Sequence, residues 1–109
     1  MRALSHMEES VRRRILEVVF RRLSPADWDV TLFGSFARGT ATPASDIDIA
    51  LQGPGPLPTA AAERIIADLE ESVPMLRDFD LVDLSTANPA LKKRVQAEGK
   101  SWHRATKTA

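Results

Sequence analysis

Apolar side chains near the start of the chain recur with the period of a helix. Between residues 10 and 23 they lie three or four positions apart, and arginines fall on the opposite side. The pattern predicts an amphipathic helix that ends near Pro25. Its apolar stripe consists of Val11, Ile15, Val18, Val19 and Leu23.

Two short strands are predicted next. Residues 28–33 alternate between apolar and polar side chains until the pattern breaks at Gly34. Residues 46–51 read Asp-Ile-Asp-Ile-Ala-Leu, which places acids and aliphatic side chains on opposite faces of a strand. The polar segment 36–45 and the segment 52–58, which holds two glycines and three prolines, are predicted to connect these elements.

The rest of the chain predicts a helix, a strand and a second helix. Thr59 is expected to cap the first of these helices and Pro74 to stop it. The strand covers residues 78–84. The last helix is expected to have Asn88 as its N-cap and to end at Gly99. The order of elements is therefore helix, strand, strand, helix, strand, helix.

Length and composition fit one small globular domain. The chain has 109 residues, of which 43% are hydrophobic and 28% are charged, with no cysteine. We expect a single domain over residues 1–109, ordered from about residue 7 to 102, with a flexible tail at 100–109. No apolar run is long enough for a membrane span, and no signal peptide is visible, so we expect a cytoplasmic protein.

The charges balance overall but are unevenly placed. Residues 1–23 contain six arginines and three glutamates, a net charge of +3. Residues 24–83 contain eleven acids and three arginines, which gives −8. Residues 84–109 contain six bases, and Glu98 is their sole acid, which gives +5. An acidic centre is unlike a nucleic-acid-binding face, where basic residues dominate, but it suits a cation site.

The first strand leads into Gly34-Ser35, a turn that we expect to open a short helix. Successive backbone N–H groups in such a turn can hold an anion, glycine lets the backbone approach closely, and the serine hydroxyl adds a donor. Gly-Ser is also a common turn dipeptide, so by itself it is more simply explained as a plain turn.

A pair of carboxylates follows after ten intervening residues. Asp46 and Asp48 lie two apart on a strand, so both leave the same face with Cα atoms about 7 Å apart. Their repulsion would be relieved by Mg²⁺, which takes carboxylate oxygens and bridges to substrate phosphates. An isolated Asp-x-Asp pair is more often an exposed strand face. Together with Gly34-Ser35, the pair predicts a nucleoside triphosphate site.

Gly34-Ser35, ten residues, then Asp46-Ile47-Asp48 resembles the signature of the DNA polymerase β nucleotidyltransferase superfamily, and specifically its minimal nucleotidyltransferase (MNT) branch. The resemblance implies a polymerase β-like α/β (α+β) fold, with a small mixed sheet of about three to four strands flanked by helices. It also implies an antitoxin that transfers AMP from ATP onto a HEPN-type ribonuclease toxin. Phe36 is a departure, because relatives often carry arginine there.

The resemblance also implies the roles of the site residues. The family places a third carboxylate on a later strand, for which the candidates are Asp78, Asp80 and Asp83. Asp80 matches the family position best and Asp83 comes next. The expected catalytic and metal-binding residues, holding two Mg²⁺ ions, are Asp46, Asp48 and Asp80. The expected nucleotide-binding residues are Gly34, Ser35, Arg38 and Ser45, although Arg38 could instead pair with a nearby acid.

Three functions remain open from the sequence. The first is a metal-dependent nucleotidyltransferase that acts on a protein partner, a HEPN-type toxin, as a hetero-oligomer and without direct nucleic-acid or membrane binding. The second is an antitoxin that acts by contact alone. The third is the nucleotide-binding subunit of a split transferase for a small molecule such as an antibiotic. A chain of 109 residues leaves little room for an acceptor pocket of its own.

Overall fold

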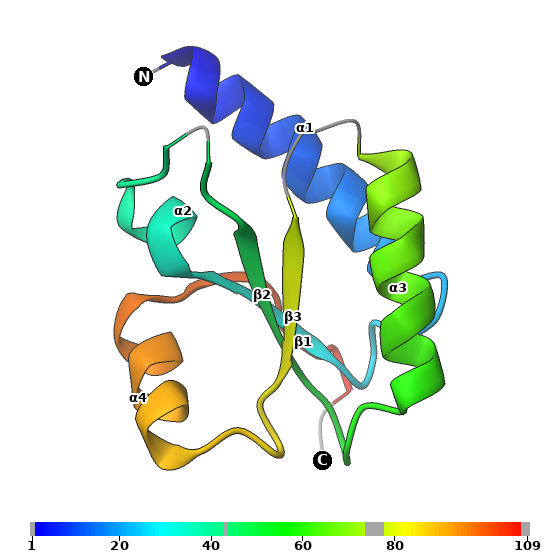
Figure 1. Ribbon diagram of the computed structural model, residues 1–109. Helices are drawn as coiled ribbons and strands as arrows, with labels where there is room; N and C mark the ends of the chain where they lie inside the picture. Colours follow the sequence, from blue (N-terminus) through cyan, green and yellow to red (C-terminus); the bar gives the residue numbers. More distant parts are fainter. Residues whose placement is uncertain (1, 43, 74–77, 108–109) are drawn as a thin grey trace.

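The computed structural model describes residues 2–42, 44–73 and 78–107. Within this part of the chain there are four helices and four strands (Figure 1). In chain order they are α1 (Arg2–Val19), β1 (Asp29–Phe33), α2 (Gly34–Arg38), β2 (Ile47–Gln52), α3 (Thr59–Ser72), β3 (Phe79–Asp83), α4 (Pro89–Glu98) and β4 (Lys100–His103).

The four strands form one mixed sheet in the order β3-β2-β1-β4. Strand β1 pairs antiparallel with β2 and with β4, whereas β2 and β3 are parallel. The parallel pair is possible because α3 carries the chain back to the starting end of β2, as a parallel connection requires. The prediction of a small mixed sheet flanked by helices is confirmed.

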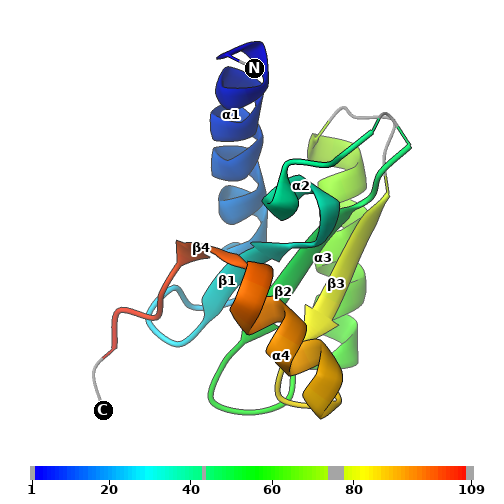
Figure 2. The same cartoon turned by 90° about the vertical axis from the view of Figure 1, so that its left-hand side faces the viewer.

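Helices cover both faces of the sheet, and each face has its own apolar cluster. Helices α1 and α3 pack on one face through a core that includes Ile15, Ile49 and Leu69. Helix α4 covers part of the opposite face, where Phe33, Ala50 and Val95 form a smaller cluster. Figure 2 shows α4 in front of the sheet and α3 behind it. Alternate residues of β2 therefore face different layers, which leaves Asp48 on the less covered side with Ala50.

The structure differs from the sequence prediction at residues 100–103. These residues form strand β4, not a loose tail. Gly99 has φ −69° and ψ 146°, an extended conformation, so the chain leaves α4 directly in a strand direction. The strand is then held at the edge of the sheet, and its last residue, His103, has its Nε2 2.7 Å from the carbonyl oxygen of Pro25.

Of the two N-caps predicted from the sequence, one is confirmed and one is wrong. Asn88 caps α4 as predicted, because its Oδ1 accepts a hydrogen bond from the Leu91 N–H at 2.8 Å. The prediction for Thr59 is wrong. Pro58 is the N-cap of α3, with no side-chain hydrogen bond, and Thr59 is already helical. The predicted stop at Pro74 lies outside the described residues.

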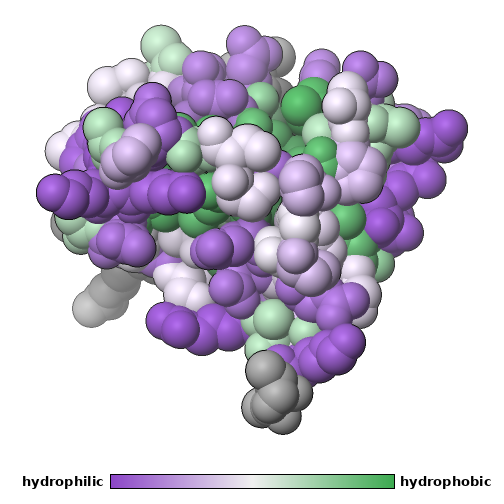
Figure 3. Space-filling view, turned by 90° about the horizontal axis from the view of Figure 1, so that it is seen from below, coloured by the Kyte–Doolittle hydropathy of each residue, from purple (hydrophilic) through white to green (hydrophobic). Residues whose placement is uncertain are grey.

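The surface seen from below is mainly hydrophilic, with smaller hydrophobic areas between the polar side chains (Figure 3). This matches a core in which the buried residues of the described chain are hydrophobic. Among the described residues, no helix combines the length and the apolar character that crossing a membrane requires.

Candidate functional site

Three neighbouring strands bring the predicted residues of the two motifs together. The last residue of β1, Phe33, is the register partner of Asp48 on β2. Asp48 is in turn the register partner of Asp80 on β3. Because register partners on paired strands point to the same face, both carboxylates belong to the face that α4 partly covers. Gly34 follows Phe33 directly and therefore lies beside Asp48 at this end of β1.

Two separate features of this site require glycine at position 34. Its φ is +75°, in the left-handed region that disfavours side chains, and a Cβ atom there would collide with the carboxylate of Asp48. The glycine turn thus lies directly against the middle carboxylate of the site. No residue with a side chain allows this approach.

Gly34→Ala is expected to lower the free energy of unfolding by about 2–4 kcal/mol, because positive φ and overpacking both oppose the methyl group. The matched control is Gly39→Ala. Gly39 has φ +77° but open space around its Cβ position. The control should therefore lose only about 1 kcal/mol, from the backbone alone. Chemical denaturation measures both variants, and equal losses would contradict the close approach to Asp48.

The carboxylates of the site repel one another. The pKa of Asp48 is raised by burial, then by the negative charges of Asp80 and Asp46, while the guanidiniums of Arg94 and Arg38 partly oppose the rise. Asp46 and Asp80 are exposed, so the charge of the site faces the solvent. This arrangement is costly for a bare protein and becomes favourable when a cation is bound.

The structure separates the candidates for the third carboxylate. Asp83 is already engaged, because it accepts hydrogen bonds from the Leu57 N–H at 2.8 Å and from the Ser85 N–H and hydroxyl at 3.0 and 2.8 Å. Burial alone would raise the pKa of Asp83, but these hydrogen bonds hold it below its ordinary value. Asp83 thus anchors the loop before α3, whereas Asp80 lies beside Asp48.

The other residues singled out in the sequence lie around this centre. Ser35 is half-buried in the first turn of α2. Ser45 stabilises the turn before β2, where its Oγ accepts a hydrogen bond from the Thr42 N–H at 2.8 Å. Phe36 packs against the main core, so the aromatic side chain at this departure from the family pattern has a structural role.

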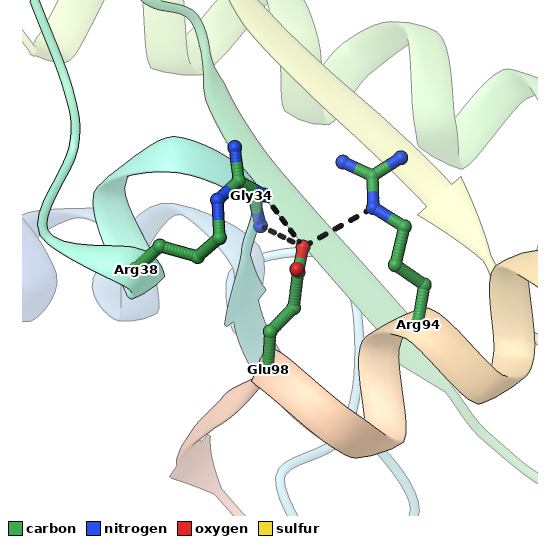
Figure 4. A network of polar contacts seen from close by, with 4 residues as sticks. All are labelled: Gly34, Arg38, Arg94 and Glu98. Carbon is green, nitrogen blue, oxygen red and sulfur yellow. Dashed lines mark hydrogen bonds and ion pairs between the residues drawn. The ribbon is translucent and has the colours of Figure 1, made fainter.

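Sequence reasoning did not assign a role to Glu98. Its Oε1 accepts hydrogen bonds from the Gly34 N–H at 3.1 Å, from Arg38 at 3.0 Å and from Arg94 at 3.2 Å (Figure 4). Burial raises the pKa of Glu98, but the hydrogen bonds from Arg38, Gly34 and Arg94 outweigh it and the net shift is downward. Arg38 thus pairs with an acid, as the alternative interpretation allowed. The signal in the sequence was a single acid within a strongly basic segment.

The donor set suits a hard divalent cation. Asp46, Asp48 and Asp80 offer carboxylate oxygens, the ligands that Mg²⁺ takes, and the repulsion at Asp48 is what a cation would relieve. Across residues 2–42, 44–73 and 78–107, no three acidic or histidine side chains are grouped closely enough to hold a metal ion as they stand.

Comparison with known proteins identifies the family. The model of the family "polymerase beta, nucleotidyltransferase" matches residues 29–106, which span the whole site from β1 to β4. The chain belongs to this nucleotidyltransferase family. Among curated proteins, no sequence matches it.

Several solved structures share the nucleotidyltransferase fold of this chain. A chain of a toxin-antitoxin complex with AMP-PNP is 31% identical, with a TM-score of 0.73 over 84% of this chain and 71% of that one. A chain of the MntA-HepT toxin-antitoxin is 28% identical, with a TM-score of 0.65 and coverages of 86% and 70%.

A third similar structure is the tri-AMPylated HEPN toxin of Shewanella oneidensis in complex with MNT antitoxin. One of its chains is 26% identical to this nucleotidyltransferase, with a TM-score of 0.68 over 86% of this chain and 70% of that one. The resemblance to MNT antitoxins, and the polymerase β-like fold that it implied, are confirmed.

Proposed function

We propose that this protein is an MNT antitoxin that transfers AMP from ATP to a hydroxyl group of a HEPN-type toxin. The observation that carries the proposal is the register of Asp48 with Asp80, with the Gly34 turn packed directly against Asp48. A family of nucleotidyltransferases supplies the reaction class. The similar structures with AMP-PNP and with an AMPylated toxin support the nucleotide and the acceptor.

Asp46, Asp48 and Asp80 would hold Mg²⁺, for which two ions are expected in this family. The metal would neutralise phosphate charge and assist the departure of pyrophosphate. Gly34, Ser35, Arg38 and Ser45 are proposed as the nucleotide-binding residues. The N–H of Gly34 is donated to Glu98, so Gly34 would contribute through its lack of a side chain, leaving the Ser35 hydroxyl for a phosphate oxygen.

The transfer itself is a displacement at the α-phosphorus of ATP. The acceptor oxygen forms a bond to that phosphorus, and the bond from phosphorus to the bridging oxygen of the β-phosphate breaks, so pyrophosphate leaves. Asp80 would take the proton of the acceptor hydroxyl. Asp80 lies beside Asp48 and is exposed to solvent, so an acceptor hydroxyl from another molecule can reach its carboxylate.

The acceptor is proposed to arrive on another molecule, because a domain of this size has little room for an acceptor pocket beside the nucleotide site. We propose that this molecule is a protein and that the two form a hetero-oligomer in the cytoplasm. The basic segments 1–23 and 84–109, with charges of +3 and +5, would attract an acidic partner surface at low salt. The similar structures are themselves toxin-antitoxin complexes.

The proposal predicts a covalent change on the toxin. Co-expression with a HEPN-type partner should yield partner molecules that are heavier by one or more AMP groups, measured by intact mass spectrometry. The Asp46→Ala, Asp48→Ala double variant should leave the partner mass unchanged, because the pair holds the metal and the triphosphate. A stable complex with no added mass in the parent would contradict transfer and leave an antitoxin that acts by contact alone.

The split small-molecule transferase makes a different prediction. In that case the partner would stay unmodified and an acceptor pocket would be completed only in the complex. Incubating the complex with labelled ATP and a panel of aminoglycosides separates the two enzymes, since the label would move to the small molecule and not to the protein.

A further inference from the structure

Glu98, the last residue of α4, joins α4 to α2 through a single carboxylate oxygen. Its Oε1 accepts hydrogen bonds from the backbone N–H of Gly34, from Nη1 of Arg38 and from Nε of Arg94 (Figure 4). The donors are the first and last residues of α2, Gly34 and Arg38, and Arg94 of α4. One carboxylate thus ties the glycine turn of the candidate site to the helix that covers its face.

The exposure of the three side chains shows how the cluster is oriented. The side chain of Glu98 is 19% exposed, whereas those of Arg38 and Arg94 are 42% and 54% exposed. The carboxylate therefore lies beneath two guanidiniums that face the solvent. Figure 4 shows the terminal nitrogens of Arg94 pointing away from Glu98, while the inner Nε makes the contact.

The charges of the cluster do not cancel. Two guanidiniums share one carboxylate, which leaves one net positive charge on the cluster. Both arginines act electrostatically on Asp48, so this charge lies close to the acidic centre. A triphosphate that reaches the carboxylates through a cation would meet the arginines with its remaining negative charge. Guanidiniums bind phosphate best when their planar fork is held in one orientation.

We propose that Glu98 is a positioning residue, which fixes the Gly34 turn and orients Arg38 and Arg94, and that Arg94 is a further phosphate-binding residue of the site. This inference rests on the proposed function. Without the carboxylate, both arginines would sample many rotamers and would lose entropy on binding a phosphate. The glycine turn would also lose its link to α4.

A competing role for Glu98 predicts the opposite change in nucleotide affinity. A carboxylate that accepts one N–H and two guanidiniums could occupy the place of a phosphate oxygen, and the nucleotide would then have to displace it. The two roles are distinguished by a single measurement. Loss of the Glu98 charge weakens nucleotide binding if the residue positions the arginines and strengthens binding if it competes.

Glu98→Gln is the direct test, with Asp68→Asn as its matched control. Asp68 of α3 also forms an ion pair, at 3.2 Å to Arg22, and its side chain is 21% exposed, but Arg22 lies in the turn after α1, away from the candidate site. Calorimetry with Mg²⁺ would compare AMP-PNP with AMP for the parent and both variants. Thermal unfolding would report the stability of each.

We expect Glu98→Gln to raise the Kd for AMP-PNP about tenfold. The Kd for AMP should change less than about threefold, because the monophosphate carries less charge for the arginines to bind. The Asp68→Asn control should lose a similar amount of stability and keep the parent's affinity for AMP-PNP. A merely structural role for Glu98 would lower the unfolding temperature and leave the ratio of the two Kd values unchanged.

The outcomes separate the two proposals. A parent that does not bind AMP-PNP with Mg²⁺ overturns the proposed function and this inference with it. A parent that binds, with a Glu98→Gln variant that binds equally well or more tightly, overturns the inference alone. Should Glu98→Gln not fold, Arg94→Gln decides in its place, since that side chain is on the solvent side of α4. It should weaken AMP-PNP binding about fivefold, and unchanged binding overturns the proposal.

Discussion

Asp80→Asn is expected to slow AMP transfer roughly a thousandfold while nucleotide binding stays within about threefold of the parent. Asparagine keeps the shape and an oxygen ligand but cannot take the proton of the acceptor hydroxyl. Asp80 is exposed beside Asp48, so the fold should not depend on its charge. Transfer of radiolabelled AMP to the partner measures the rate, and calorimetry with Mg²⁺ and AMP-PNP measures binding.

Asp83→Asn is the matched control for this prediction, three residues further along the same segment. Its carboxylate accepts hydrogen bonds from Leu57 and Ser85 and is part of the loop structure. The control should lose about 1–2 kcal/mol of stability and retain most of the transfer rate. Loss of transfer in the Asp83 variant with normal transfer in the Asp80 variant would move the third carboxylate to Asp83.

Asp48→Asn is expected to weaken the binding of AMP-PNP with Mg²⁺ at least about 100-fold. Asp48 is the central carboxylate, with Asp80 as its register partner and Gly34 packed against it. An amide there provides one neutral oxygen in place of an anionic ligand. In calorimetry, the parent should bind only when Mg²⁺ is present, and the variant should show little heat in either condition. Equal affinities in parent and variant would place the nucleotide elsewhere.

The stability of Asp48→Asn serves as a control for its folding. Burial and the charges of Asp80 and Asp46 raise the pKa of Asp48, so the folded state disfavours its ionised form. A raised pKa contributes stability at low pH that is lost as the pH rises through it. Without metal, Asp48→Asn should therefore be more stable than the parent at neutral pH, by up to about 1 kcal/mol. Weaker binding by a more stable protein cannot be attributed to unfolding.

Local patterns in the sequence predicted most of the elements and the chemistry. Helical and alternating periodicity located three of the strands and the long helices, because these periods directly reflect which face is buried. The Gly34-Ser35 turn and the Asp46, Asp48 pair were recognisable because glycine conformation and the repulsion of neighbouring carboxylates are local properties. The same residues resemble the signature of the nucleotidyltransferase superfamily, and the family is confirmed by the match over residues 29–106.

Strand pairing was decided only by the tertiary structure. The resemblance to the family favoured Asp80 over Asp83, but the sequence does not show which strand pairs with this one or in what register. The parallel register of β2 and β3 makes Asp80 the partner of Asp48 and leaves Asp83 to the loop before α3. Strand β4 was missed for a related reason, because a short polar segment forms a strand only when a neighbouring edge is free to pair with it.

The amino-acid sequence by itself thus determined the types of elements, the acidic centre and the reaction family of this protein. The tertiary structure determined which residues meet. Glu98 and Gly34 are 64 positions apart, and no periodicity relates them, yet they are joined by a hydrogen bond of 3.1 Å. Contacts of this kind depend on how the sheet and α4 pack, and packing sums many weak interactions across the whole chain. The positioning of the site is therefore a property of the fold and not of the motif.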